Sequence, residues 1–113
     1  MKNNEINYIE FKANDLERIK SFYSHLFGWK FTDYGPTYTA FEESGLSGGF
    51  EKTDEAIING ALVVLYHEDL EALKADIVDF GGEIAQDIFS FPGGRRFHFK
   101  DPSGNELAVW SDK

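Results

Sequence analysis

The beginning of the chain combines a strand-like pattern with a helix-like one. Polar and apolar residues first alternate, so that Ile9 and Phe11 share one face of a predicted strand. Asn14 or Asp15 then supplies an N-cap, and Gly28 suits the residue that ends a helix. Between cap and stop, apolar residues recur at helical spacing: Leu16, Ile19, Phe22, Tyr23, Leu26 and Phe27. The pattern predicts a half-covered strand followed by an amphipathic helix.

Shorter extended segments follow this helix. Strands are predicted at residues 29–31, 38–42 and 47–51, with a turn at residues 34–36 between the first two. The polar stretch over residues 52–59 ends in Asn-Gly and is typical of a linker. The first half of the chain therefore reads as strand, helix and three further strands.

The second half repeats this order of elements. A strand over residues 61–66 leads to Asp69, which serves as a second cap, and a helical stripe then ends at Gly81-Gly82. The stripe consists of Leu70, Leu73, Ile77 and Phe80. A shift of 54 positions superimposes the two caps and places Gly28 on Gly82. Because caps and stops define element boundaries, this match indicates a duplication. The remaining strands are expected at residues 83–88, 95–100 and 106–110.

Three motifs accompany the two βαβββ modules. The first helix carries Phe22-Tyr23 and Phe27-Gly28-Trp29, and the segment Asp101-Pro102-Ser103-Gly104-Asn105-Glu106-Leu107 precedes the last strand. In this combination the chain resembles the vicinal oxygen chelate superfamily, which includes glyoxalase I, bleomycin-resistance proteins and extradiol dioxygenases. That fold hosts lyases, epimerases, dioxygenases and drug-sequestering proteins, so function must be argued from the site residues.

The resemblance implies an α+β fold in a single domain over residues 1–113. Two tandem modules, at about residues 1–55 and 56–113, are expected to form a cupped mixed sheet, the glyoxalase/bleomycin resistance/dihydroxybiphenyl dioxygenase fold. The resemblance also implies a homodimer.

Composition limits the partners. The chain has 113 residues, of which 42% are hydrophobic, and this suffices for a core without disulfides. Twenty acidic against eleven basic residues give a net charge of -9, which repels nucleic-acid phosphates and anionic lipid headgroups, so neither partner is expected. Cysteine is absent, no apolar run approaches the ~20 residues of a membrane span, and no signal-peptide core follows residues 1–4. A cytoplasmic protein that binds a small organic molecule is expected.

The resemblance assigns metal-ligand positions that this chain does not fill with usual ligands. Metal-dependent members carry His, Gln or Glu at the start of each module's first strand and carboxylates near the end of its last strand. The matching positions are Tyr8, Leu62, Ala108 and a position near Gly49, where Glu51 is the nearby carboxylate. Divalent ions prefer imidazole or carboxylate ligands. We therefore expect no metal and no other cofactor.

Strand alternation predicts which residues face the helices and which face the cup. The helix-facing set is Ile9, Phe11, Val63, Leu65, Phe97, Phe99, Leu107 and Val109. The inward set is Tyr8, Glu10, Lys12, Leu62, Val64, Tyr66, Arg96, His98, Lys100, Glu106, Ala108 and Trp110. From the inward set we predict a ligand-binding group suited to an aromatic or mixed polar compound: Tyr8, Glu10, Tyr66, Arg96, His98, Glu106 and Trp110. The alternative is that the aromatic residues fill the groove while the charged ones form cross-strand pairs.

His98 is the candidate catalytic residue. As a general base near neutral pH it would be oriented by Glu10 or Glu106, and the alternative is a structural histidine with satisfied hydrogen bonds. The segment Gly93-Gly94-Arg95-Arg96 either presents a guanidinium group to an anionic part of a ligand or forms a solvated hairpin tip.

Three functions compete at this point. The first is a metal-free binding protein that sequesters or senses an aromatic or cationic compound, in the manner of bleomycin-resistance proteins. The second is a glyoxalase-type lyase or isomerase with an unconventional metal site around Glu10, Glu51, His98 and Glu106. The third is a structural module without a ligand. Whether the protein catalyses a reaction, and which ligand it takes, stay open in the sequence.

Overall fold

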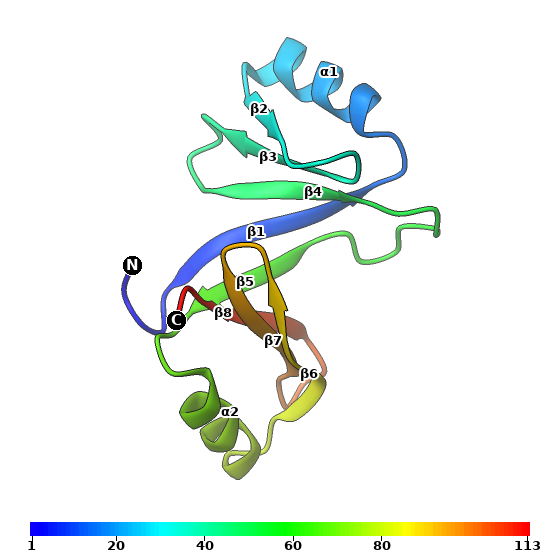
Figure 1. The fold of residues 1–113 in the computed structure, drawn as a ribbon. Coiled ribbons are helices and arrows are strands. Elements are labelled where there is room, and N and C mark those ends of the chain that lie inside the picture. The colour runs from blue at the N-terminus through cyan, green and yellow to red at the C-terminus, as the bar shows by residue number, and fades with distance from the viewer. The chain divides into compact units, whose positions relative to one another are not determined.

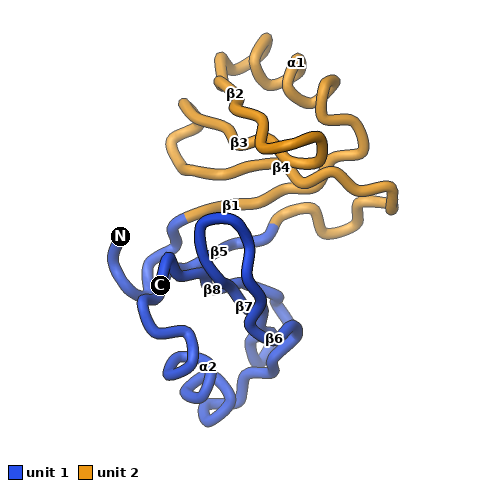
Figure 2. Tube along the Cα trace, viewed as in Figure 1, with its two compact units in different colours: residues 1–7, 62–113 blue, residues 8–61 orange.

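A computed structural model describes residues 1–113 and contains eight strands and two helices (Figure 1). The chain divides into two units, unit 2 with residues Tyr8–Ala61 and unit 1 with Met1–Asn7 and Leu62–Lys113 (Figure 2). In chain order the elements are β1 (Ile6–Ala13), α1 (Leu16–Phe27), β2 (Lys30–Asp33), β3 (Tyr38–Glu42), β4 (Gly48–Lys52), β5 (Leu62–Tyr66), α2 (Leu70–Asp79), β6 (Glu83–Phe91), β7 (Gly94–Lys100) and β8 (Glu106–Ser111). Neither helix has the length and apolar composition needed to cross a bilayer.

Unit 2, orange in Figure 2, contains one helix on a four-stranded sheet. Its strands lie in the order β2-β3-β4-β1, and β1 and β4 run parallel while the other pairs are antiparallel. Asp15 caps α1 by accepting a hydrogen bond from the Arg18 backbone N–H at 3.1 Å, and Gly28 ends the helix in the left-handed conformation. The core consists of Ala13, Leu16, Phe41 and Phe50, with Ile9, Phe11, Ile19, Tyr23, Trp29 and Phe31 packed against them.

Unit 1, blue in Figure 2, repeats this arrangement in the strand order β6-β7-β8-β5. Here β5 and β8 run parallel, and β6, β7 and β8 are antiparallel neighbours. Asp69 caps α2 by accepting a hydrogen bond from the Ala72 backbone N–H at 3.1 Å. The N-terminal segment joins β5 because the Asn4 N–H donates to the Tyr66 carbonyl at 2.8 Å. The core consists of Leu70, Phe97 and Val109, surrounded by Leu65, Leu73, Ile77, Ile84, Ile88 and Phe99.

The predicted fold class is confirmed: the chain is an α+β protein with two βαβββ modules. Both predicted caps, Asp15 and Asp69, serve as N-caps. The cores also confirm six of the helix-facing assignments: Ile9, Phe11, Leu65, Phe97, Phe99 and Val109. Period-two alternation therefore identified the covered face of each sheet correctly.

The helices depart from the sequence prediction in two respects. The left-handed residue after α2 is Gly81, with a φ of 96°, and not Gly82, because the helix already ends at Asp79 and Phe80 is its C-cap. Phe80 is 86% exposed and does not belong to the core stripe. Three members of the α1 stripe are also more than half exposed: Phe22, Leu26 and Phe27. A single helix on one sheet buries only a narrow stripe, so apolar residues beside that stripe stay on the surface.

Several strands are longer or shifted relative to the prediction. β2 begins at Lys30 because Trp29 packs into the core of unit 2, and β6 runs to Phe91 instead of stopping at Ile88. The extension of β6 brings Phe89 and Phe91 into the antiparallel ladder with β7. Two additional aromatic side chains thereby join the sheet of unit 1.

The turn between β7 and β8 is stabilised by Asp101. Its carboxylate accepts hydrogen bonds from the backbone N–H groups of Ser103 and Asn105 at 2.9 and 3.0 Å, and from the Asn105 side-chain amide at 2.9 Å. Gly104 takes a φ of 94°, which favours glycine. The hydrogen bonds from Asn105 and from the turn backbone lower the pKa of Asp101, because they favour the charged carboxylate.

This lowered pKa predicts a pH-dependent contribution to stability. The folded-state pKa of Asp101 lies below the unfolded value, so its stabilisation is present above the unfolded pKa and is lost as pH falls through the folded one. Asp101→Asn should therefore lower the urea midpoint at pH 7, and the difference from wild type should shrink as pH falls below about 4. Asp79→Asn, at the end of α2, is the control. A difference that grows toward low pH would contradict the role of the carboxylate.

Candidate functional site

A chain of hydrogen bonds links three polar side chains on one face of unit 2. Glu10, on β1, is only 6% exposed. The Tyr38 hydroxyl, on β3, donates to Glu10 Oε1 at 3.2 Å, and the Tyr8 and Tyr38 hydroxyl oxygens lie 2.7 Å apart. Burial raises the pKa of the Tyr38 phenol, and its hydrogen bond with Tyr8 and the charge of Glu10 raise it further. Tyr38 therefore stays neutral at physiological pH and acts as a donor to the carboxylate.

Tyr38 reaches Glu10 because the strand between them carries no side chain at the crossing point. Gly49 on β4 pairs with Glu10 on one side and with Ala40 on the other. A Cβ atom at Gly49 would lie 2.5 Å from the Tyr38 hydroxyl oxygen and 2.7 Å from its ring. The ring thus occupies the space above Gly49. The sequence analysis missed Tyr38, although the adjacent glycines 48 and 49 in a strand are a signal of such a close approach.

On the corresponding face of unit 1, His98 is a buried histidine. His98 lies on β7 and is 8% exposed. Its Nδ1 atom lies 3.0 Å from Glu106 Oε2, and Glu106 is on the neighbouring strand β8. Its Nε2 atom is buried and has no hydrogen-bond partner. Of the two carboxylates expected to orient His98, Glu106 makes this contact in unit 1.

Aromatic side chains surround this face of unit 1. Trp110 contacts Tyr66 edge-to-face with 5.4 Å between ring centroids, and its ring lies 6.4 Å from that of Phe91. The Arg96 guanidinium carbon lies 5.3 Å from the Phe89 ring centroid and 5.9 Å from that of Phe91. Such distances are typical of cation–π contacts. The sequence analysis missed Phe89 and Phe91, because it ended the strand before them.

The polar atoms of Trp110 and Tyr66 already have partners within unit 1. The Trp110 indole N–H donates to Asn7 Oδ1 at 2.9 Å, and the Tyr66 hydroxyl donates to the Asp112 carboxylate. This hydrogen bond raises the pKa of Tyr66 and lowers that of Asp112. Neither side chain has a free hydrogen-bonding group, and since Tyr66 is only 5% exposed, the accessible aromatic surface of the pair belongs to Trp110.

The seven predicted ligand-binding residues thus fall into local groups. Tyr8 and Glu10 lie together in unit 2, joined through Tyr38. In unit 1 the structure pairs His98 with Glu106 and Tyr66 with Trp110, while Arg96 packs on aromatic rings. Neighbouring Arg95 forms an ion pair with Glu71 at 2.6 Å, so its guanidinium group is engaged within the unit.

The positions that the family uses for metal ligands contain no cluster of donors. Ala108 is fully buried opposite His98 in the β7–β8 ladder, and Leu62 begins β5. Glu51 forms an ion pair with Lys12 at 3.4 Å. Within either unit, no three His, Cys, Asp or Glu side chains gather closely enough to hold a metal ion.

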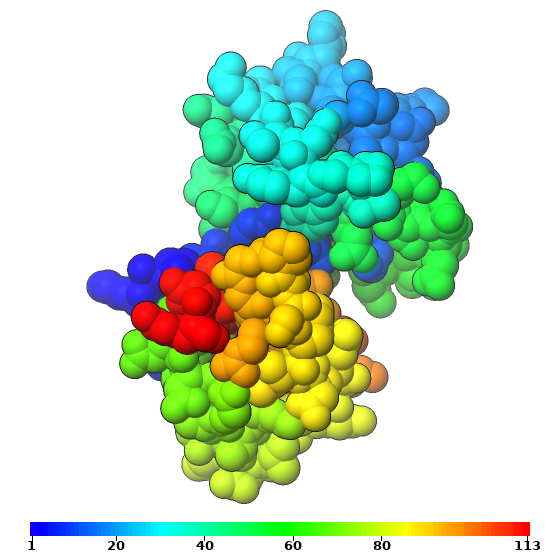
Figure 3. Space-filling view, viewed as in Figure 1, coloured from blue at the N-terminus to red at the C-terminus, as the bar shows by residue number.

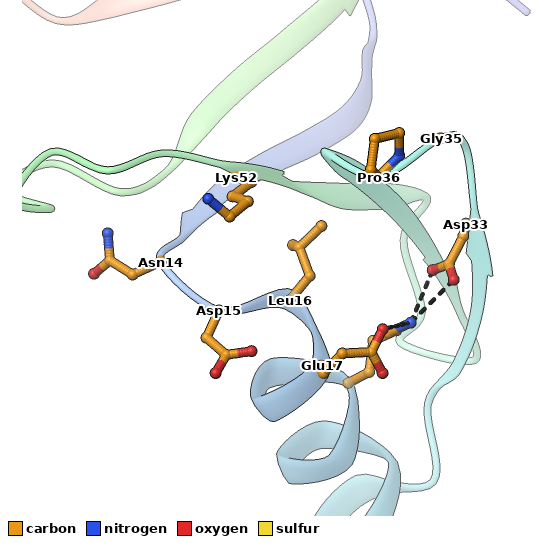
Figure 4. A pocket seen from close by; sticks show the side chains of 9 residues that line it. Asn14, Asp15, Leu16, Glu17, Asp33, Gly35, Pro36 and Lys52 are labelled. Carbon is orange, nitrogen blue, oxygen red and sulfur yellow. Dashed lines mark hydrogen bonds and ion pairs between the residues drawn. The ribbon is translucent and has the colours of Figure 1, made fainter.

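A cavity of about 300 Å³ opens in unit 2 at the start of α1 (Figure 4). It is lined by Asn14, Asp15, Leu16, Glu17, Lys20, Asp33, Gly35, Pro36 and Lys52. Lys20 Nζ lies 2.8 Å from Glu17 and 3.0 Å from Asp33, so its charge is already paired. Lys52 is paired with Asp54 at 3.1 Å. None of the seven predicted residues lines this cavity, and we do not assign it to the candidate site.

Comparisons with known proteins agree on one family and one fold. The model of the Glyoxalase/Bleomycin resistance protein/Dioxygenase superfamily matches residues 5–109. A glyoxylase-like domain-containing protein from Didymella fabae is 31% identical over 122 residues, covering 93% of this chain and 91% of its own.

Solved structures are similar over nearly the whole chain. Methylmalonyl-CoA epimerase from Streptomyces coelicolor has a TM-score of 0.74 at 18% identity, with coverage of 97% of this chain and 98% of its own. The Mn(II)-bound glyoxalase from Novosphingobium aromaticivorans has a TM-score of 0.71 at 23% identity, with coverage of 98% of this chain and 40% of its own. These likenesses support the fold, and they do not transfer an activity.

The close approach of Tyr38 to Gly49 predicts a sharp response to one added methyl group. Gly49→Ala should lower the free energy of unfolding by roughly 1–3 kcal/mol, as overpacking typically does, because the new Cβ atom meets the Tyr38 ring. Urea denaturation measures this change.

A double-mutant cycle controls for other causes of this loss. In a Tyr38→Ala background the ring is gone, so Gly49→Ala should cost much less there. An equal loss of stability in both backgrounds would show that the Tyr38 ring is not what excludes the methyl group.

Proposed function

Since the chain belongs to the Glyoxalase/Bleomycin resistance protein/Dioxygenase superfamily, we propose that it is a metal-independent member that binds a small molecule, sequestering or sensing an aromatic or cationic compound. The observation that carries this proposal is the donor set at the family's metal positions. Tyr8, Leu62 and Ala108 stand at three of these positions, and the fourth lies near Gly49, where Glu51 is the nearby carboxylate. Ligand binding then depends on the chain's own hydrogen-bonding and aromatic side chains.

The residues at these positions do not fit a divalent cation. Leu62 and Ala108 have no donor atom, and Gly49 has no side chain. The Tyr8 phenol oxygen is hydrogen-bonded to Tyr38. Glu51, the carboxylate near Gly49, forms an ion pair with Lys12 at 3.4 Å. Zinc sites normally contain three or four imidazole, thiolate or carboxylate ligands, and magnesium or manganese sites use oxygen ligands in larger number. The proposal therefore contains no metal-dependent step.

The remaining side chains favour an aromatic or cationic ligand. Trp110 presents a ring whose polar atom is already hydrogen-bonded, so it can contribute stacking surface at little cost in desolvation, supported from behind by the buried Tyr66 ring. The net charge of -9 concentrates cations near the protein and enlarges their association rates. These two properties support a planar, neutral or cationic compound over an anionic one.

Metal analysis combined with thermal shift tests the proposal. We expect the purified protein to carry less than about 0.1 equivalent of Zn, Ni, Mn or Fe, and we expect EDTA to leave its melting temperature unchanged, because the metal positions lack donors. A stoichiometric metal that EDTA removes, with loss of stability, would refute metal independence.

Ligand binding is tested separately with a panel of aromatic and cationic compounds. At least one compound should raise the melting temperature, and Trp110→Leu should weaken its binding roughly tenfold, the effect of about 1.4 kcal/mol of lost stacking. Tyr34→Leu, which removes an exposed aromatic ring of unit 2, is the matched control. Folded protein that responds to no member of the panel would contradict a binding function.

A further inference from the structure

We infer that Nε2 of His98 is the ligand-binding atom of unit 1 and that it accepts a hydrogen bond from a hydroxyl group on a compact aromatic molecule. This inference rests on the proposed small-molecule binding and specifies the chemistry of the ligand. Three residues take part. His98 supplies the Nε2 acceptor, Glu106 orients its ring, and Phe89 packs beside it.

The contact with Glu106 determines which tautomer His98 adopts. A carboxylate only accepts hydrogen bonds, so the neutral imidazole places its proton on Nδ1, which lies 3.0 Å from Glu106 Oε2. Nε2 then carries a lone pair and functions as an acceptor. The Glu106 side chain is 46% exposed while that of His98 is 10% exposed, so a solvated carboxylate orients a buried ring.

The Nε2 acceptor is unsatisfied in the structure, unlike the polar side-chain atoms of Trp110 and Tyr66. It has no hydrogen-bond partner and is shielded from solvent. By contrast, the indole N–H of Trp110 and the hydroxyl group of Tyr66 each have a partner within unit 1. Buried polar atoms are almost always paired, so a native exception requires an explanation, and a functional role is one of them. A ligand that donates to Nε2 would supply the missing hydrogen bond.

Phe89 packs beside His98 from an edge strand whose ladder is irregular. The two rings lie 5.9 Å apart at an angle of 40°. Phe89 belongs to β6, the edge strand of the unit 1 sheet, whose ladder with β7 shifts register on both sides of Gln86. Figure 3 shows the surface of β6 and the β6–β7 hairpin, yellow to orange, open to solvent on this face. An interrupted edge strand constrains its side chains less than a regular ladder does.

The surroundings of His98 select a compact aromatic ligand. Its neighbour across the ladder is Ala108, which contributes only a methyl group. On the β6 side its ladder partner is Gln86, and the Phe89 ring lies 5.9 Å from the imidazole with the Arg96 guanidinium group against it. A ring that replaces Phe89 would keep the aromatic contact with the imidazole and the cation–π contact with Arg96. A hydroxyl group on that ring would donate the hydrogen bond that Nε2 lacks.

Phenol and anisole are the matched probes, because anisole has the same ring and lacks the hydroxyl proton. In ¹⁵N-labelled protein we expect His98 to appear as the Nδ1–H tautomer, and we expect phenol to shift its Nε2 resonance. Phenol should bind at least about fivefold more tightly than anisole, the factor that a hydrogen bond of ordinary strength provides. His98→Leu should abolish this difference, while the control His25→Leu, on the exposed side of α1, should preserve it.

Variants of the two neighbours test the orienting and packing roles. Glu106→Gln should reduce the share of the Nδ1–H tautomer, because an amide can also donate to Nδ1. Phe89→Ala should increase the affinity for phenol, since the ligand no longer displaces a ring.

The outcomes separate this inference from the proposed function. If panel compounds bind but phenol and anisole do not differ, or His98→Leu binds phenol as wild type does, the inference fails and the binding function stands. An Nε2–H tautomer in the free protein also overturns the inference without any ligand. If no compound binds, both the proposed function and the inference fail.

Discussion

Each module depends on the burial of one sheet face beneath a single helix. In unit 1, Leu70 of α2 is fully buried with Phe97 and Val109 of two neighbouring strands. Successive residues of a strand point to opposite faces, so the burial of Phe97 and Val109 sends His98 and Ala108 to the other face. The polar side chains of the candidate site therefore take their positions from the core. A register slip would exchange the two faces of the strand, and both the core and the candidate site would be lost.

Burying polar groups on the second face requires partners for them. Glu10 is satisfied in part by Tyr38, which reaches it across the bare backbone of Gly49. His98 receives a partner at Nδ1 from Glu106 and none at Nε2. Because a buried polar atom without a hydrogen bond is unfavourable, such networks are usually complete. The incomplete hydrogen-bond network of His98 in unit 1 is therefore more informative about function than the network of Glu10 in unit 2.

The residues matched to the family's metal positions lie apart from the helix-covered cores. The positions that relatives use for metal ligands lie on the strands but contribute no side chains to the helix-covered cores, which contain neither Gly49 nor Ala108. In unit 2, the space above Gly49 is occupied by the ring of Tyr38. One scaffold can in this way support both metal-dependent enzymes and binding proteins.

The sequence by itself determined the class of fold, both helix caps and most of the core, because these follow from local periodicity and from side chains that satisfy nearby backbone groups. It also identified His98 and Glu106 as candidates. Only the tertiary structure decided that Tyr38 contacts Glu10, that Phe89 packs beside His98 and that Phe80 lies on the surface. Those relations join residues that are distant in the chain, or depend on how wide a stripe each helix buries. Local sequence patterns do not encode these relations, because they depend on the register between strands and on which side chains fill a shared space.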